Sequence, residues 1–432
     1  MNYEIKSFVK IIKEMNLIDI LIGMSYDLTS IPKINELLNN TNSRDELAKS
    51  LKLKYNIWKH DNGINYHIIK YNKEWLSKDL VETYGLLRSL IFKNDGKIVC
   101  FAPPKSLNTD NLEIDKSLEF MAERYIEGTM INVFYDDESN TWEIATKSNV
   151  GGKVCFFMEE GFKEENTFKK MFEEVCVKLN LDLNQLNKNY IYSFVMQHPR
   201  NRIVKIIREM KLYLVEVYKI ENNTTINIIN IKTAEDLNIP DSVELNDKIE
   251  IKNYYDLNLC KETLASMNTP YATVGVMIKN NKGQRYKFRN PNYEHVRNLR
   301  GNQPKLQYQY INLRKTGKVK EYLQYYKEHR KSFESFRSII HDYTNELHNN
   351  YIRCYIKKEK ELKEFPEKFR THMYNLHHEL YLKKLMPEKK YINKETVINY
   401  FNDLHPAKQM YVLNYDVRKN YKHSKLQSEM VE

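Results

Sequence analysis

The pattern of hydrophobic and polar positions divides the chain into two parts. Up to about Asn290, short apolar runs alternate with polar residues at the period of a β-strand, and turn residues separate the runs. Beyond Val319 the apolar residues recur at helical spacing, with breaks near Pro366, Pro387 and Pro406. The pattern therefore predicts a sheet-rich part followed by a helical part.

Pairs of strands joined by turn residues are the main signal in the first part. Asp61-Asn62-Gly63 and Asn94-Asp95-Gly96 stand between apolar runs and are typical of hairpin turns. The sequence predicts strands at residues 55–58, 66–69, 86–92, 97–101, 124–135, 142–147, 190–196, 203–207, 212–220, 226–231, 274–279 and 284–289. It predicts helices at residues 3–14, 167–179 and 253–267, where apolar residues share one face.

These elements predict an α+β protein, with an antiparallel-sheet domain followed by an all-helical C-terminal domain. We expect a helical N-terminal segment at residues 1–50, a sheet domain at 51–300 and a helical domain at 301–432. A chain of 432 residues is long enough for two or three domains with cores of their own.

The composition argues against several classes of protein. Hydrophobic residues make up 41% of the chain and aromatic residues 12%, which disfavours wholesale disorder. No apolar run reaches membrane-spanning length and no charged-then-apolar leader opens the chain, so we expect a soluble cytoplasmic or nuclear protein that is not secreted. The five cysteines have no paired spacing, which favours reduced, structural thiols.

The net charge of +11 is concentrated in the last third of the chain. Residues 301–432 hold 26 Lys and Arg against 16 Asp and Glu, and 15 of the 32 tyrosines. A basic, aromatic-rich helical domain suits a polyanion such as RNA, because cations neutralise phosphates and rings stack on bases. A solvated helical surface in the lysine-rich proteome of an A/T-rich virus or parasite accounts for the same charge, and both interpretations stay open.

Residues whose side chains could take part in binding or catalysis lie in short motifs of the first part. Residues 123–131 read Glu-Arg-Tyr-Ile-Glu-Gly-Thr-Met-Ile, with an acidic residue and a glycine ahead of a small hydroxyl residue. Arg88 opens Arg-Ser-Leu-Ile-Phe, Lys105 lies in Pro-Pro-Lys-Ser-Leu-Asn, and Lys147 lies in Ile-Ala-Thr-Lys-Ser-Asn-Val. Pro-Arg-Asn-Arg-Ile-Val occupies residues 199–204, and Tyr-Lys-Phe-Arg occupies residues 286–289.

In this order the motifs resemble those of the phage-type RNA ligase family, in the superfamily of covalent nucleotidyltransferases. The resemblance covers about Tyr55 to His295 and implies an antiparallel-sheet nucleotidyltransferase fold that uses ATP and Mg²⁺. It implies that a cleft gripping ATP or a phosphorylated RNA end is lined by Arg88, Lys105, Glu127, Lys147, Lys287 and Arg289. At each cation, an exposed hairpin side chain is the alternative interpretation.

Three departures from the family pattern concern its chemistry. In the family, a lysine three places before the motif glycine attacks the α-phosphate of ATP, and here that place holds Tyr125. A phenol with a reference pKa of about 10 is mostly protonated and cannot form the phosphoramide. Val195 replaces one family glutamate, and Tyr271 or a neighbour replaces another, so oxygen ligands for Mg²⁺ and the ribose are missing.

The favoured prediction is an RNA-binding, ligase-like protein that has lost adenylylation, with a protein partner as a further ligand. One alternative is an active ATP-dependent RNA ligase or nucleotidyltransferase with a relocated nucleophile, for which Lys105 is the candidate. A second alternative is a structural or scaffolding protein with a vestigial cleft. His372, His377 and His378 fit no zinc spacing and are expected to be partly exposed helical side chains.

Overall fold

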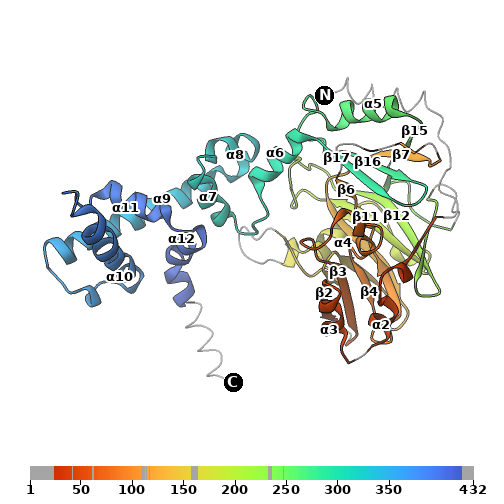
Figure 1. Ribbon diagram of the computed structural model, residues 1–432, viewed down its shortest axis with the longest axis horizontal. Helices are drawn as coiled ribbons and strands as arrows, with labels where there is room; N and C mark the ends of the chain where they lie inside the picture. Colours follow the sequence, from red (N-terminus) through yellow and green to blue (C-terminus); the bar gives the residue numbers. More distant parts are fainter. Residues whose placement is uncertain are drawn as a thin grey trace. The chain divides into compact units, whose positions relative to one another are not determined.

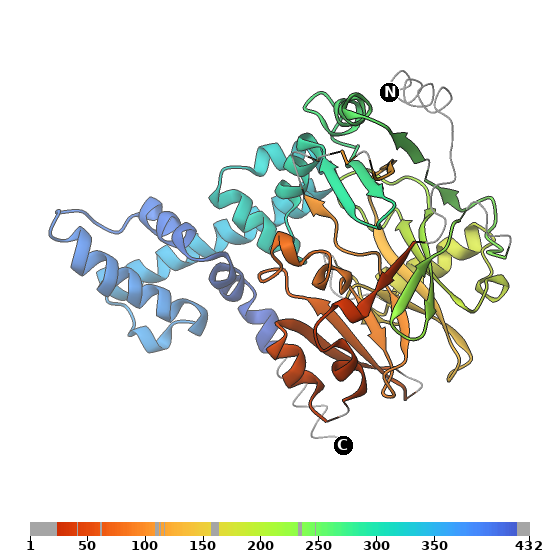
Figure 2. The ribbon, with the colours of Figure 1, turned by 45° about the vertical axis from the view of Figure 1, so that its right-hand side comes forward.

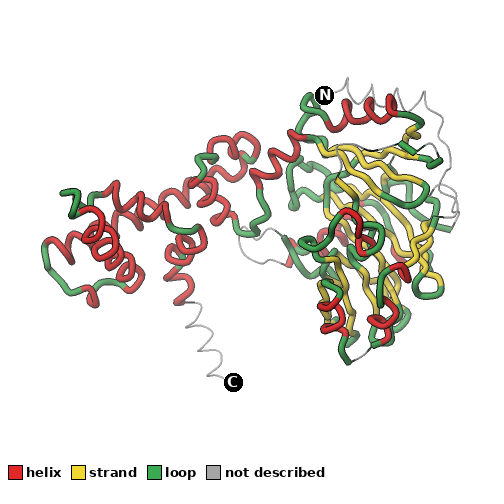
Figure 3. The backbone as a smooth tube through the Cα atoms, viewed as in Figure 1, coloured by secondary structure: helices red, strands yellow, loops and turns green. Residues whose placement is uncertain are grey.

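The computed structural model describes residues 24–40, 42–60, 63–108, 112, 114–115, 117–156, 164–231, 236–246 and 248–420. The chain forms two compact units, the first ending at Arg297 and the second beginning at Asn298. Strands lie in the first unit, whereas the second unit consists of helices and loops (Figures 1 and 3). The helix predicted at residues 3–14 lies outside the described residues.

The largest sheet of the first unit has eight strands in the order β1-β13-β12-β11-β8-β9-β10, with β14 beside β12. Its neighbours are antiparallel except for the short parallel pair of β12 with β14. The strands are β1 (Ser25–Asp27), β8 (Thr129–Asp136), β9 (Thr141–Thr146), β10 (Asn149–Val150), β11 (Tyr190–Gln197), β12 (Lys211–Glu221), β13 (Thr225–Ile228) and β14 (Glu244–Leu245).

Two smaller sheets complete the first unit, one of five strands (β15-β7-β16-β17-β6) and one of four (β2-β3-β4-β5). The five-stranded sheet contains β6 (Leu107–Asn108), β7 (Phe120–Arg124), β15 (Lys248–Ile251), β16 (Gly275–Asn280) and β17 (Arg285–Arg289). The four-stranded sheet contains β2 (Leu53–Lys59), β3 (Asn65–Tyr71), β4 (Leu90–Phe92) and β5 (Ile98–Phe101). Short 3-10 helices lie at Leu28–Ser30, Lys78–Leu80, Tyr84–Leu86, Glu164–Asn166 and Leu183–Gln185.

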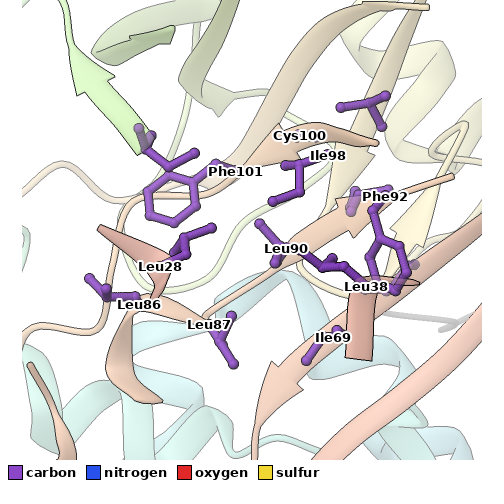
Figure 4. Packing of buried hydrophobic residues seen from close by; sticks show 14 of the residues in the cluster. Leu28, Leu38, Ile69, Leu86, Leu87, Leu90, Phe92, Ile98, Cys100 and Phe101 are labelled. Atoms are coloured by element: carbon purple, nitrogen blue, oxygen red, sulfur yellow. The ribbon is translucent and has the colours of Figure 1, made fainter. Parts of the chain in front are cut away.

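Helices cover the sheets through apolar faces. The helix α4 (Phe168–Lys178) packs on the eight-stranded sheet through Phe168, Met171, Phe172 and Val175, at the spacing of one helix face. The helix α5 (Tyr254–Ala265) packs on the five-stranded sheet and lies beside β16 and β17 in both views (Figures 1 and 2). The four-stranded sheet is covered by α2 (Ile34–Asn39) and α3 (Arg44–Ser50). Figure 4 shows the core formed there, with Leu38 of α2 near Phe92 of β4.

The predicted α+β class, with antiparallel sheets followed by a helical region, is confirmed. The hairpins predicted in the first part are confirmed as the antiparallel pairs β2–β3, β4–β5, β8–β9 and β16–β17. The predicted helices at residues 167–179 and 253–267 correspond to α4 and α5.

Three predicted strands differ from the structure. Residues 124–135 are two strands of different sheets, because β7 ends at Arg124 and β8 begins at Thr129. Residues 203–207 form no strand, since both edges of the neighbouring β11 are already paired with β8 and β12. The strand predicted from residue 86 begins only at Leu90, after a 3-10 turn.

Helices follow one another from residue 291 onward. They are α6 (Pro291–Arg300), α7 (Leu306–Lys315), α8 (Val319–Tyr325), α9 (Arg330–Tyr351), α10 (Glu367–Tyr374), α11 (Lys394–Asp403) and α12 (Pro406–Leu413). Two π-helices, η7 (Ile352–Ile356) and η9 (Asn375–Leu385), continue α9 and α10, and 3-10 helices lie at Lys327–His329 and Leu362–Glu364. Among the described helices, none is both long and apolar enough to cross a membrane.

Candidate functional site

The motif segment around Tyr125 crosses from one sheet to another. It follows β7 of the five-stranded sheet and precedes β8 of the eight-stranded sheet. Gly128 has φ +155°, and a Cβ at this position would lie 2.4 Å from the carbonyl oxygen of Met196 and 2.7 Å from Cγ1 of Val195. A side chain therefore does not fit, and glycine permits the close approach of the two strands.

The Tyr125 side chain is tied to an arginine of β17. Its phenol oxygen accepts a hydrogen bond from Nη2 of Arg289 (3.2 Å), and the guanidinium lies 5.3 Å from the centre of the Tyr125 ring. Glu294 of α6 accepts from Nη1 of the same arginine. The Tyr125 N–H donates to the carbonyl of Gly275 (3.0 Å), which extends the pairing of β7 with β16. Both backbone and side chain thus fix the phenol.

Seven cations form a group in which each acts on the pKa of another member or is acted on by one, and Arg88, Lys105 and Arg289 also interact with Tyr125. We call them the cation cluster: Lys70, Lys73, Arg88, Lys105, Lys147, Lys287 and Arg289. They come from all three sheets, on or beside β3, β4, β5, β9 and β17. All five cations predicted from the motifs belong to the cluster, so the fold brings them together.

Burial and like charge lower the pKa of four lysines of the cluster, Lys70, Lys105, Lys147 and Lys287. Burial, and after it Lys105 and Arg289, lower the pKa of Lys287 to about 7. Partial burial, and after it Arg88, lower the pKa of Lys147 to about 8. Lys105 lies close enough to Lys287 to lower its pKa, and the Lys105 amine donates to the carbonyl of Ser106 (2.7 Å). The cation cluster therefore carries positive charge that nearby acidic side chains do not balance.

The cluster also changes Tyr125. Burial raises the pKa of its phenol, but Arg289 and Arg88 stabilise the phenolate more strongly, and the resulting pKa lies below the ordinary value of 10.0. The sequence-based assumption of a reference pKa at this position is thus wrong. The chemical limit remains, because an oxygen nucleophile cannot form the phosphoramide of a lysine.

Glu127 contacts the backbone of residues 204 and 205 rather than the cations of the cluster. Its carboxylate accepts the N–H groups of Val204 (3.1 Å) and Lys205 (3.0 Å), and the Tyr293 phenol is hydrogen-bonded to it. The side chain is only 6% exposed, and burial raises the pKa of its carboxyl. These contacts hold the segment at residues 203–207 in place of the strand predicted there. Glu127 therefore anchors a loop in this structure, unlike the predicted site cations.

The side chains around the cluster do not provide a magnesium site. Val195 is buried in β11, and Tyr271 precedes β16. Nowhere in the described part of the chain do three His, Cys, Asp or Glu side chains group so as to hold a metal ion. Mg²⁺ requires oxygen ligands at close range, whereas this site offers amines, guanidiniums and phenols. These residues suit an anion and do not fit a Mg²⁺ held by the protein.

Four residues of the site were missed by sequence reasoning: Lys70, Tyr71, Lys73 and Arg285. The Tyr71 ring lies 5.0 Å from the Lys147 amine. Arg285 is buried, donates from Nη1 to the Pro104 carbonyl (3.2 Å) and acts on the pKa of Tyr125. The sequence pattern could have predicted Arg285, because Arg285, Lys287 and Arg289 alternate along β17 and so share one face of the strand. Lys70 and Lys73 belong to no motif.

Comparison with known proteins finds likeness only among solved structures. No family model matches the sequence, and no curated protein sequence matches it. Two structures described as archaeal ATP-dependent RNA ligase align with TM-scores of 0.38 and 0.41, at 14% and 12% identity, over 71% of this chain and 74% and 78% of theirs. One described as an ATP-dependent DNA ligase from Aquifex aeolicus aligns with a TM-score of 0.38 at 14% identity, over 78% of this chain and 87% of that chain.

Proposed function

We propose that this chain binds a phosphate-bearing nucleotide or RNA end without becoming joined to it. The observation that carries the proposal is the cation cluster itself, gathered around a tyrosine where the resembling ligases place their reactive lysine. The cations that the motifs share with that family are retained, and the residues needed for the covalent step and for Mg²⁺ are replaced. A protein of phage RNA-ligase type that has lost adenylylation fits this combination.

The electrostatics of the cluster explain why an anion would bind there. Holding seven cations together is unfavourable, and the lowered pKa values of Lys287 and Lys147 reflect that cost. A phosphate group would offset the repulsion, with Arg88 and Arg289 as planar donors and the lysines as point charges. The Lys287 and Lys147 amines would take up protons as the phosphate arrives. Direct neutralisation by side chains leaves no need for Mg²⁺ in binding.

The residues have distinct roles in this proposal. Arg289 bridges Tyr125 and Glu294, so its guanidinium is already ordered when the ligand arrives. Lys105 lies close enough to Lys287 to lower its pKa, and a phosphate oxygen bound by both would favour the charged form of each amine. Tyr125 orients Arg289 through its phenol oxygen and forms no bond to phosphorus. RNA is the favoured polymer ligand, because the helical region adds positive charge and aromatic rings.

Two measurements test the proposal. Incubation with α-labelled ATP and Mg²⁺ or Mn²⁺ should leave no covalent label on the chain. Equilibrium binding of 5′-phosphorylated single-stranded RNA should weaken with salt, and Lys287→Met should reduce the salt slope by about 1. Lys178→Met, an exposed lysine at the end of α4, is the matched control and should leave the slope unchanged. Absence of any affinity for ATP or RNA would instead favour a scaffold with a vestigial cleft.

A second candidate is an active nucleotidyltransferase with a relocated lysine. The lowered pKa values of Lys105 and Lys287 favour it, because an uncharged amine is the reactive form. The amine nitrogen would attack the α-phosphate of ATP, a P–N bond would form, and pyrophosphate would leave. Covalent labelling of the wild type that disappears in Lys105→Ala or Lys287→Ala would establish this function and overturn the first.

A further inference from the structure

The second unit contains an unusual stretch of backbone. The π-helices η7 and η9 continue α9 and α10, and η9 runs for 11 residues. Their wide turns are visible in the hydrogen bonds, since the Lys357 N–H donates to Ile352 (2.9 Å) and the Met386 N–H donates to Tyr381 (2.8 Å), each five residues back. A π-helix is rare, is mostly limited to one turn and often occurs at functional sites.

The two π-helices bring five rings together, which we call the ring platform: Tyr355, Tyr374, His377, His378 and Tyr381. The rings of Tyr355 and His377 are stacked at 3.9 Å with 10° between their planes, and Tyr381 stacks on His377 at 5.6 Å. Tyr374 lies 4.3 Å from His378, whose ring meets His377 edge-on. The rings are already ordered against one another, so a ligand that stacks on them would lose little side-chain entropy in the protein.

The platform is partly open to solvent. Tyr374 is 47% exposed, and the remaining four rings are half-buried. Ile356 and Met386, next to the platform in sequence, are 59% and 50% exposed. By contrast, Tyr322, Tyr326 and Phe333 are at most 2% exposed and form a core. The platform is therefore a preassembled aromatic surface rather than part of that core.

The charge around the platform is positive. Residues 351–360 and 374–390 hold eight Lys and Arg against three Glu. Glu359 and Glu379 pair with Arg353 and Lys383, which leaves most of the excess on exposed side chains such as Lys358 and Lys384. Burial, and after it His378, lower the pKa of His377, which favours the uncharged form of its ring at neutral pH.

We propose that the ring platform binds unpaired bases of single-stranded RNA, with the surrounding lysines on the phosphates. Stacking on an aromatic ring is available to every base, and the positive surroundings match a polyanion. Double-stranded RNA would not use the platform, because its bases are already stacked within the helix. The proposal shares the ligand class of the proposed function but involves a different set of residues in a different unit.

The test compares variants of the full chain on two polyanions, a single-stranded oligouridylate and inorganic polyphosphate. Tyr374→Ala and Tyr355→Ala should each weaken oligouridylate binding about tenfold while leaving polyphosphate binding unchanged, because only RNA offers bases to stack. Tyr374→Phe should bind like the wild type, because it keeps the ring. Tyr255→Ala, which removes a tyrosine that is 74% exposed on α5 of the first unit, is the matched control.

A second readout is the position of cross-links. Oligouridylate carrying 5-iodouridine should cross-link to platform residues of the wild-type chain, as mapped by mass spectrometry. This readout does not depend on whether the alanine variants fold. Unchanged RNA affinity in both alanine variants, or equal losses for RNA and polyphosphate, would overturn the platform. The cation cluster is tested separately. RNA binding that falls with Lys287→Met and not with Tyr374→Ala would reject the platform alone. RNA binding that falls with Tyr374→Ala and not with Lys287→Met would reject the cluster as the RNA site.

Discussion

Replacing Lys287 by methionine should stabilise the empty protein near neutral pH. Methionine keeps the length and the apolar stem of the side chain and removes the charge that Lys105, Arg289 and Arg88 oppose. The pKa of Lys287 falls from 10.5 to about 7 on folding, so the unfolded chain binds more protons between these values. The wild-type free energy of unfolding should therefore rise with pH across this window and be lowest below it.

The magnitude follows from the size of the shift. A change from 10.5 to about 7 corresponds to about 5 kcal/mol against the charged amine. Solvent screening at this half-buried side chain reduces the effect on stability to about 2 kcal/mol. The variant should thus be more stable than the wild type by about 2 kcal/mol at about pH 6.

Urea unfolding at about pH 6 and about pH 9 measures the effect. The advantage of Lys287→Met should shrink as pH rises and the wild-type amine loses its proton. Lys178→Met, on the exposed end of α4, should follow the wild type at both pH values. Parallel curves for the wild type and Lys287→Met would refute the reasoning, because the amine would then carry no cost from its neighbours.

Three further perturbations test the fold that positions the site. Glu216→Gln should cost about 3–5 kcal/mol, because Lys279 lies buried between Glu216 and Glu123 and would lose an ion-pair partner. Burial raises the pKa of Glu216, but Lys279, Lys248 and Arg285 together lower it more, so this stabilisation should be present above about pH 4.5 and lost as pH falls through the lowered pKa. Equal acid sensitivity of the variant and the wild type would contradict this. Gly128→Ala should cost more than about 2 kcal/mol in urea unfolding, since its Cβ would lie 2.4 Å from a carbonyl oxygen, whereas Gly317→Ala, with φ +70° and open space, should cost about 1 kcal/mol. Phe172→Ala should cost about 3–5 kcal/mol, because this ring on α4 is 2% exposed, and a loss below about 1 kcal/mol would reject its place in the core.

Local patterns predicted most of the elements correctly. Alternation of apolar residues identified β11 and β12, and Asn94-Asp95-Gly96 identified the turn between β4 and β5. The same alternation failed at residues 203–207, where Val204 and Ile207 are buried without a strand and Ile206 is exposed. The backbone N–H groups of Val204 and Lys205 bond to the Glu127 carboxylate, a residue far away in sequence, and no local pattern reveals such a partner.

The motif segment shows a similar limit. A continuous apolar pattern from Arg124 to Tyr135 predicts one strand, yet Gly128 lets the chain pass from one sheet to the next. That crossing is set by the packing of β8 against β11, because the carbonyl of Met196 leaves no room for a side chain. The consequence for function is direct, since the crossing places Tyr125 beside Arg289 of β17.

The sequence by itself determined most of the element types, the excess charge of residues 301–432 and the identities of five cations proposed for the site, because these depend on residue order and side-chain chemistry alone. Only the tertiary structure decided that these cations meet, that Lys70 and Lys73 join them, and that the Glu127 carboxylate accepts the N–H groups of Val204 and Lys205. It also decided the pKa values of Tyr125 and Lys287, since electrostatic coupling depends on distance and burial. These two pKa values depend on residues far apart in the chain, and they arise only once the three sheets have assembled.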